Sequence, residues 1–151
     1  MKSKFYAASK QTYGLAEECV KTNCYGTKGV TEALLRCLLL SNSGRIVNVS
    51  AGLGKLQFVP NERVRMELND VDTSAYTISK AAMNAYTRIV AKSYPSLLIN
   101  CVCPGFVKTD MTSNTGLFTV EVGAKGPVML AFLPEGGPSD LFFEKMEAST
   151  F

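Results

Sequence analysis

Histidine is the most informative absence in this sequence, because none of its 151 residues is a histidine. Without an imidazole, the chain has no Ser-His-Asp or Cys-His catalytic arrangement and no histidine metal site. Any proton transfer near neutral pH must therefore use another side chain whose pKa is shifted from its usual value.

Cysteine pairs with metal or redox spacing are missing as well. The sequence has five cysteines, an odd number, and none of them forms the C-x-x-C spacing of zinc sites and redox motifs. We therefore expect no metal site, and we interpret the cysteines as small buried hydrophobic residues in a reducing compartment. They are Cys19, Cys24, Cys37, Cys101 and Cys103.

Long apolar runs and clusters of charge are also absent. No apolar stretch of signal-peptide length follows Met1, and the leucine-rich segment 34–40 is interrupted by Arg36 and too short to cross a bilayer. The net charge is only +3, and the lysines and arginines are scattered, so nucleic-acid binding has little support. We expect a soluble cytoplasmic protein that binds neither nucleic acid nor membranes.

Composition and length indicate one globular domain. Hydrophobic residues make up 46% of the chain and charged residues 19%, as in ordinary soluble proteins. A chain of 151 residues can bury one sizeable core but not two. We predict a single domain over residues 1–151, in which residues 1–11 form a loose lead-in.

The spacing of the apolar residues predicts an α/β fold. Helical periods predict helices at residues 13–40, 74–94 and 119–133, with a short one around 61–68. Short apolar runs, typical of strands covered on both faces, predict strands at 45–49, 97–103 and 141–143. This order predicts a partial doubly wound, Rossmann-like parallel sheet of about three strands with flanking helices.

The first predicted helix has one polar residue on its apolar face. Asn23 falls on that face, where an apolar side chain would be expected. The other residues of the face are Ala16, Cys19, Val20, Thr27, Val30, Leu34 and Leu38.

Tyr76 and Lys80 are the first candidates for chemistry. They lie four positions apart on the predicted helix 74–94, so their side chains rise from the same face. An ammonium group near a phenol favours the phenolate, which lowers the tyrosine pKa and makes the phenol usable as a general acid or base. A tyrosine and a lysine at this spacing are more often exposed surface residues without a catalytic role than an active site.

Three further motifs surround this pair. Strand 45–49 runs into Ser50-Ala-Gly, strand 97–103 runs into Pro104-Gly-Phe-Val-Lys-Thr, and Thr22-Asn lies in the first helix. Together with Tyr76-Thr-Ile-Ser-Lys80, these motifs resemble those of the short-chain dehydrogenase/reductase family. Segments 107–111 and 133–139 are most similar to its plant group of neomenthol dehydrogenases, salutaridine reductases and carbonyl-reductase-like enzymes. The resemblance begins near residue 14 and implies only the C-terminal half of that family's fold.

The resemblance implies roles for the candidate catalytic residues. Tyr76 matches the residue that passes a proton to the substrate carbonyl as hydride arrives from NADPH. Lys80 matches the residue that holds the nicotinamide ribose and lowers the tyrosine pKa. Asn23 matches the helix asparagine that anchors a proton-relay water, with a core amide bonded to backbone as the alternative. Ser50 is the hydroxyl residue beside the position of the family's catalytic serine.

The resemblance also implies a cofactor and a substrate class. Pro104, Gly105, Val107 and Thr109 match the segment that contacts the nicotinamide and phosphates of NADP(H). Segment 112–122 corresponds to the region that covers the substrate. The implied reaction is the NADPH-dependent reduction of a ketone or other carbonyl, similar to menthone or an alkaloid ketone.

Three departures from the family pattern predict that catalytic activity and NADP(H) binding are impaired in this chain. The catalytic serine position holds Ala51, and its neighbour Ser50 should point to the opposite face of an extended chain. The glycine-rich phosphate loop is missing, because Gly52-Leu-Gly54 lacks the third glycine of the fingerprint, so NADP(H) binding should be weak. The segment between Gly54 and Tyr76 is shorter than in the plant group.

Two readings other than a reductase stay open. The chain could be an inactive interaction or oligomerisation module, because helices 13–40 and 74–94 commonly build the subunit interface in the family. It could also be a truncated gene product with no role of its own. The family strand that would pair with strand 45–49 is absent, so that strand should have an open edge that favours self-association.

Overall fold

The computed structural model describes residues 12–55 and 74–151. Their helices and strands follow one another along the chain as α2 (Tyr13–Val20), η1 (Lys21–Gly26), α3 (Thr27–Leu39), β1 (Arg45–Val49), η2 (Gly52–Gly54), α5 (Ser74–Ser93), β2 (Leu98–Cys103), η4 (Asp110–Thr112), α6 (Val120–Ala131), β3 (Phe142–Glu144) and β4 (Glu147–Ser149). The helix predicted around residues 61–68 lies outside the described residues.

The strands form one sheet in the order β1-β2-β3-β4. Strands β1, β2 and β3 are parallel, as predicted, with Arg45 opposite Leu98 and Cys101 opposite Phe142. Strand β4 is antiparallel to β3 and was not predicted, because Glu147–Ser149 is short and has no apolar alternation. The α/β class and the three parallel strands are confirmed, and the complete sheet is mixed.

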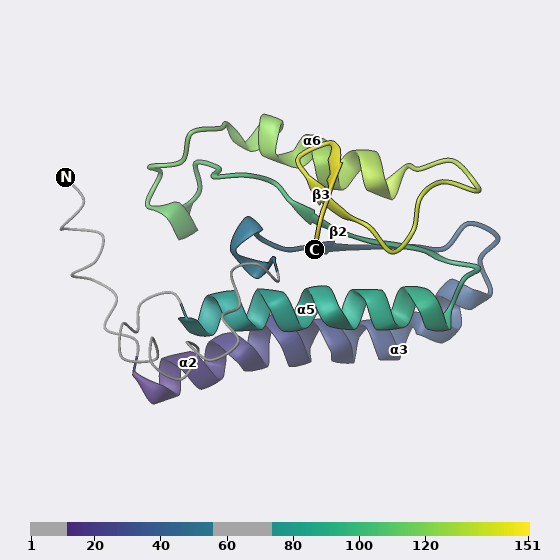
Figure 1. Cartoon of the computed structure of the whole chain (residues 1–151), viewed down its shortest axis with the longest axis horizontal. Helices are drawn as coiled ribbons and strands as arrows, with labels where there is room; N and C mark the ends of the chain where they lie inside the picture. Colours follow the sequence, from purple (N-terminus) through teal and green to yellow (C-terminus); the bar gives the residue numbers. More distant parts are fainter. Residues whose placement is uncertain (1–11, 56–73) are drawn as a thin grey trace.

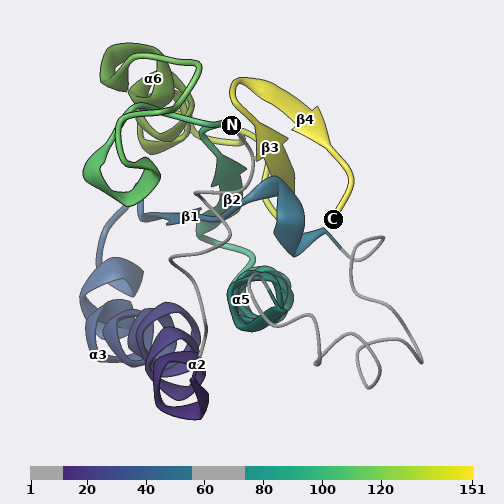
Figure 2. The same cartoon turned by 90° about the vertical axis from the view of Figure 1, so that its left-hand side faces the viewer.

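Helices cover both faces of the sheet. In Figure 1, α3 and α5 run side by side beneath the strands, and α6 lies above them. Figure 2 shows the same layers end on, with α2, α3 and α5 on one side and α6 on the other. This is the three-layer arrangement of an open α/β fold.

The core lies on both faces of the central strand β2. Ile99 is fully buried and packs with Val90 of α5 and with Leu97. On the other face, Val102 packs with Leu130 of α6 and with Phe143. A strand buried on both faces explains why the sequence of β2 is almost continuously apolar.

The first predicted helix contains a π-helical segment, η1, between α2 and α3. The apolar face predicted for this helix is not uniformly buried, because Val30 and Leu34 are 62% and 53% exposed. Thr31 is buried in their place.

Strand β1 is an edge strand, as predicted, because among residues 12–55 and 74–151 it pairs with β2 alone. A groove of about 460 Å³ runs between this strand and α3. Val30, Leu34 and Ile46 are among the apolar residues that line it.

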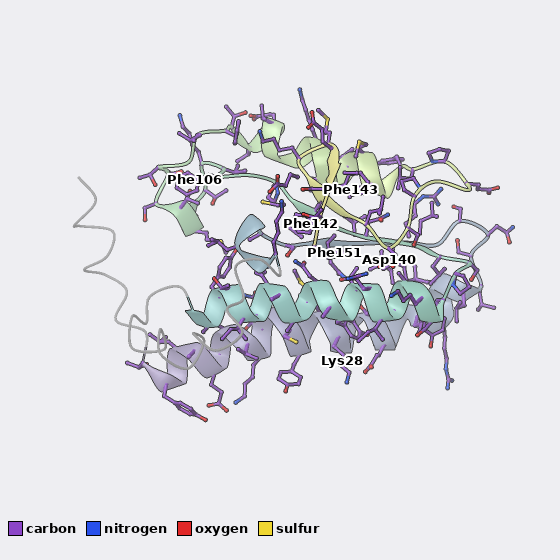
Figure 3. All side chains as sticks on the ribbon, in the orientation of Figure 1. Lys28, Phe106, Asp140, Phe142, Phe143 and Phe151 are labelled. Atoms are coloured by element: carbon purple, nitrogen blue, oxygen red, sulfur yellow. The ribbon has the colours of Figure 1, made fainter. Side chains whose placement is uncertain are left out.

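Aromatic and charged side chains connect the end of the chain to α5. The Arg88 guanidinium lies 4.7 Å from the centre of the Phe151 ring, and its Nε donates to Asp140 at 3.4 Å. The Phe151 ring in turn packs against Phe142, with 6.0 Å between ring centres. Figure 3 shows Asp140, Phe142 and Phe151 close together between the sheet and α5.

Candidate active site

Tyr76 and Lys80 lie one turn apart near the start of α5. The helix is favoured here because Ile78, Ala82 and Ala85 recur at helical spacing and Pro95 follows its end. The Lys80 ammonium lies 5.6 Å from the centre of the Tyr76 ring. The structure thus brings the predicted pair together on one helix face.

Lys80 connects α5 to the carboxyl end of β1. Its Nζ donates to the backbone carbonyl of Val49 at 3.0 Å. Partial burial is the largest cause of its pKa shift and lowers the pKa below 10.5, while the nearby thiols of Cys19 and Cys101 act in the opposite direction. The ammonium therefore has a fixed position beside the sheet.

The pKa of Tyr76 shifts in the direction opposite to the one expected. Burial raises it above 10.0, and the nearby thiols of Cys103 and Cys19 raise it further. The expectation of a net lowering of this pKa is therefore wrong for this structure, because loss of hydration of the phenolate dominates. The phenol holds its proton at neutral pH.

Asn23 lies in the π-helical segment η1 and faces α5. Its Nδ2 donates to Ser79 Oγ at 3.0 Å, and Ser79 Oγ donates to the backbone carbonyl of Tyr76 at 2.8 Å. The backbone carbonyl of Asn23 accepts from the Thr27 hydroxyl at 2.8 Å. Asn23 is therefore joined to the turn that carries Tyr76.

Ser79 is a site residue that sequence reasoning did not single out. It is fully buried and forms the only bridge that we find, among the described residues, between the Asn23 amide and the Tyr76 backbone. A polar residue on the inner face of the predicted helix, directly before Lys80, is the sequence feature that could have indicated this role.

The Ser50 side chain is buried and bonded to α5. Its hydroxyl is buried and donates to Asn84 Oδ1 at 2.6 Å. The neighbouring Ala51 is partly exposed and has extended backbone angles. As expected for adjacent residues of an extended segment, the two side chains face different surroundings.

The glycines after Ala51 serve close packing. A Cβ at Gly54 would lie 2.9 Å from the backbone carbon of Lys80 and 2.9 Å from its Cβ. Only glycine allows the η2 turn to approach α5 so closely. Gly54 therefore packs the η2 turn against α5.

The loop after β2 carries the predicted cofactor-contacting residues. Gly105 has a φ of +86°, a left-handed conformation that favours glycine. Val107 forms a β-bridge with Phe118, and Thr109 caps the short helix η4. Pro104 begins this loop at the carboxyl end of β2, the edge at which open α/β sheets bind ligands.

Lys55 is a buried lysine that the sequence pattern did not indicate. The Lys55 ammonium lies 2.9 Å from Glu144 Oε1 and donates to Ser149 Oγ at 2.9 Å. Lys55 is only 7% exposed. The contact joins the loop after β1 to the β3–β4 hairpin, and no local pattern in the sequence connects residues so far apart.

The described residues contain no group of His, Cys, Asp or Glu side chains that could hold a metal ion. The expectation that the cysteines are buried holds for Cys101 but is wrong for Cys37, which is exposed. Within the described part of the chain, no helix is long and apolar enough to cross a membrane.

The sequence is similar to known reductases. The sequence pattern of the short chain dehydrogenase family matches residues 3–118. Short-chain dehydrogenase/reductase 1 of Saponaria officinalis is 46% identical over 173 residues, which cover 94% of this chain and 57% of that protein. The (+)-neomenthol dehydrogenase of Arabidopsis thaliana is 42% identical, with 93% of this chain and 58% of that protein covered.

The fold is also similar to solved structures. Salutaridine reductase from Papaver somniferum matches with a TM-score of 0.80 and 41% identity, covering 89% of this chain and 56% of that one. The menthone neomenthol reductase from Mentha piperita matches with a TM-score of 0.68 and 39% identity, covering 91% and 53%. The chain spans about half the length of the relatives that it matches.

Tyr76 should ionise only above pH 10.0, because burial raises its pKa from that value. We expect an ultraviolet titration to lose one tyrosine step above pH 10 in Tyr76→Phe. Tyr13→Phe is the control, because this side chain is 86% exposed and far less buried than Tyr76. Because the folded chain holds the Tyr76 proton more tightly than the unfolded chain, the free energy of unfolding falls as pH rises above the tyrosine pKa of the unfolded chain. Tyr76→Phe removes this group, so the stability of the variant should fall less at alkaline pH. A Tyr76 step below pH 10 would contradict the assignment.

Proposed function

The chain belongs to the short chain dehydrogenase family, and from this premise we propose that it reduces a ketone or related carbonyl compound with NADPH, at impaired efficiency. The observation that carries the proposal is the Lys80 ammonium held 5.6 Å from the Tyr76 ring. A phenol with a neighbouring cation is the acid–base group that a chain without histidine can offer.

Tyr76 is the proposed proton donor. Its raised pKa keeps the phenol protonated at neutral pH, and the protonated form is the one that can donate to a carbonyl oxygen that becomes negative. The nearby Lys80 ammonium stabilises the phenolate that remains after the transfer. In this proposal Tyr76 donates the proton, and Lys80 stabilises the negative charge left on Tyr76.

Asn23 is the proposed anchor of the proton supply to Tyr76. Its backbone carbonyl accepts from the Thr27 hydroxyl, and we propose that the same carbonyl oxygen also binds a water. The Asn23 side chain, through Ser79, keeps this carbonyl in a fixed position relative to the turn of Tyr76.

Lys80 and the loop after β2 are the proposed contacts of NADPH, which supplies the hydride when bound. A lysine ammonium has three N–H donors, and Val49 accepts from one of them, so the others can reach ribose hydroxyls. Pro104, Gly105, Val107 and Thr109 border the carboxyl end of β2, where a nicotinamide and its phosphates fit the general rule for open α/β sheets.

Two features support impaired activity. Ala51 has no hydrogen-bond donor for the substrate oxygen, and the hydroxyl of Ser50 is already bonded to Asn84. The η2 turn uses its glycine for contact with α5 and offers no fingerprint loop for the pyrophosphate. We therefore propose that NADPH binds weakly to this chain.

The substrate class is proposed from the similar proteins. Their names include neomenthol dehydrogenase, salutaridine reductase and (-)-isopiperitenone reductase, so we propose a menthone-like or alkaloid-like cyclic ketone. Menthone is a suitable first substrate.

Loss of the Tyr76 hydroxyl should abolish turnover. We expect Tyr76→Phe to reduce the rate of menthone-dependent NADPH oxidation by about 10²–10⁴-fold, since it removes the proton donor. Tyr86→Phe is the matched control, because Tyr86 lies on the same helix and packs against the core. Equal rates in Tyr76→Phe and the unchanged chain would refute the mechanism. Absence of saturable NADPH binding would refute the reductase proposal itself.

Restoring a hydroxyl at the serine position should increase turnover. We expect Ala51→Ser to raise the maximal rate by about 10²–10³-fold, because one added donor stabilises the developing oxyanion. NADPH affinity should not change, since residue 51 would contact the substrate. The rate and the NADPH dissociation constant are measured separately, and an unchanged rate would show that Ala51 is not the limiting defect.

A second candidate function is an interaction module, favoured by the edge of β1. Backbone hydrogen bonds to β2 involve Gly44 and Ser50, so by alternation the backbone groups of Arg45 and Val47 point away from the sheet. Exposed apolar residues of α3 lie beside this edge in the groove. An edge next to an apolar groove is suited to pairing with another polypeptide, including a second copy of this chain.

A charge in the groove should suppress self-association. We expect the sedimentation coefficient of the chain to rise with concentration, and Leu34→Arg to remove much of this rise. Leu40→Arg is the control, because Leu40 is exposed but does not line the groove. A concentration-independent monomer would exclude this second function.

A further inference from the structure

We propose that Asn84 is a positioning residue for the candidate site. Its buried amide holds the loop of residues 50–54 against α5 at the level of Lys80. The importance of this role for catalysis rests on the proposed function. The contacts of Asn84 themselves can be tested without measuring turnover.

Both ends of the Asn84 amide bind the loop. The Oδ1 accepts from Ser50 Oγ at 2.6 Å, and the Nδ2 donates to the backbone carbonyl of Gly54 at 2.9 Å. Asn84 is only 3% exposed, and Ser50 is 4% exposed. One side chain therefore bridges the first and last residues of the loop, in a place where a lost partner leaves a buried polar group without a hydrogen bond.

The loop held in this way touches the turn that carries Lys80. Gly54 approaches the backbone of Lys80 so closely that no side chain fits between them. Residue 84 lies one helical turn beyond Lys80, and the Val49 carbonyl that binds Lys80 directly precedes Ser50. A shift of the loop would consequently move Ala51 and expose the Lys80 ammonium. Figure 2 shows the η2 turn, in blue, next to α5.

A second contact fixes the other side of the same loop. Lys55 follows Gly54 and is bound to Glu144 and Ser149 of the β3–β4 hairpin. Asn84 thus holds the loop to the helix, while Lys55 holds it to the sheet. The Asn84 contact therefore acts together with the Lys80–Val49 hydrogen bond to hold Ala51 near the Tyr76–Lys80 face.

The chemistry requires an amide at this position. The site needs one acceptor for Ser50 and one donor for Gly54, and asparagine supplies one of each. An ionised carboxylate would accept from Ser50 but would repel the Gly54 carbonyl. A protonated carboxylic acid again supplies one acceptor and one donor, so Asn84→Asp should mimic the amide only at acidic pH.

The first test measures Lys80 by NMR of its side-chain nitrogen. In Asn84→Ala we expect the Lys80 pKa to rise toward 10.5, because the released loop no longer buries the ammonium. The titratable groups that face Lys80 are Cys19, Cys101 and Tyr76, and they are unchanged in this variant. Asn48→Ala is the matched control, because Asn48 donates to Thr87 of the same helix at 2.7 Å and does not touch the loop.

The second test follows hydrogen exchange at the Gly54 amide, which donates to the Ala51 carbonyl at 2.9 Å. Exchange should accelerate about tenfold or more in Asn84→Ala. It should return toward the original rate when Asn84→Asp is acidified, relative to the unchanged chain at the same pH. If Asn84→Ala does not fold, Ser50→Ala, which removes only one of the two bonds, should show the same effects at smaller size.

The outcomes separate this inference from the proposed function. An unchanged Lys80 pKa and unchanged Gly54 exchange in Asn84→Ala would overturn the positioning role. The same changes in Asn48→Ala would also overturn it, because they would report general loosening of α5. If the NMR effects occur but no variant oxidises NADPH, the positioning role stands and the reductase proposal fails. If turnover occurs, Asn84→Ala should cancel the gain from Ala51→Ser.

Discussion

The hydrogen bond from the Lys80 ammonium to the Val49 carbonyl is the contact around which the candidate site is built. It ties the helix that carries Tyr76 to the end of β1, at the point where the chain turns into the loop of Ala51. Asn84 and Gly54 secure the same junction one helical turn further along. The acid, the cation and the vacant serine position are therefore parts of one packed unit, and none of them can move without disturbing the others.

The electrostatics of this unit differ from the simplest view of a tyrosine–lysine pair. Burial raises the pKa of Tyr76 and lowers that of Lys80, since hydration favours both charged forms and the site removes part of it. A phenol that holds its proton suits reduction, in which the phenol must donate. The lysine then matters most after the transfer, when a negative oxygen remains beside it.

The sequence allowed most of the fold to be predicted, because periodic apolar residues specify α5 and the runs at β1 and β2 specify buried strands. It also identified Tyr76, Lys80 and Asn23, whose contacts follow from helix spacing and from one polar residue on an apolar face. It could not predict β4, the π segment or the Lys55–Glu144 contact. These features depend on tertiary partners distant in the chain, on which local patterns carry no information. The exposure of Val30 and Leu34 could not be predicted either, because a helical period shows which residues share a face but not what covers that face.

The parallel sheet has a consequence for how the chain acquires its structure. Strand β1 pairs with residues near 98, and β2 pairs on its other side with residues near 142. Among the strands of residues 12–55 and 74–151, only β3 and β4 pair with a neighbour close in the chain. During synthesis on the ribosome, β1 and the first helices emerge long before the strand that completes their core. Folding should therefore be slow and should follow synthesis of the later strands. Chaperones that bind exposed apolar strands should be needed most while α5 is being synthesised.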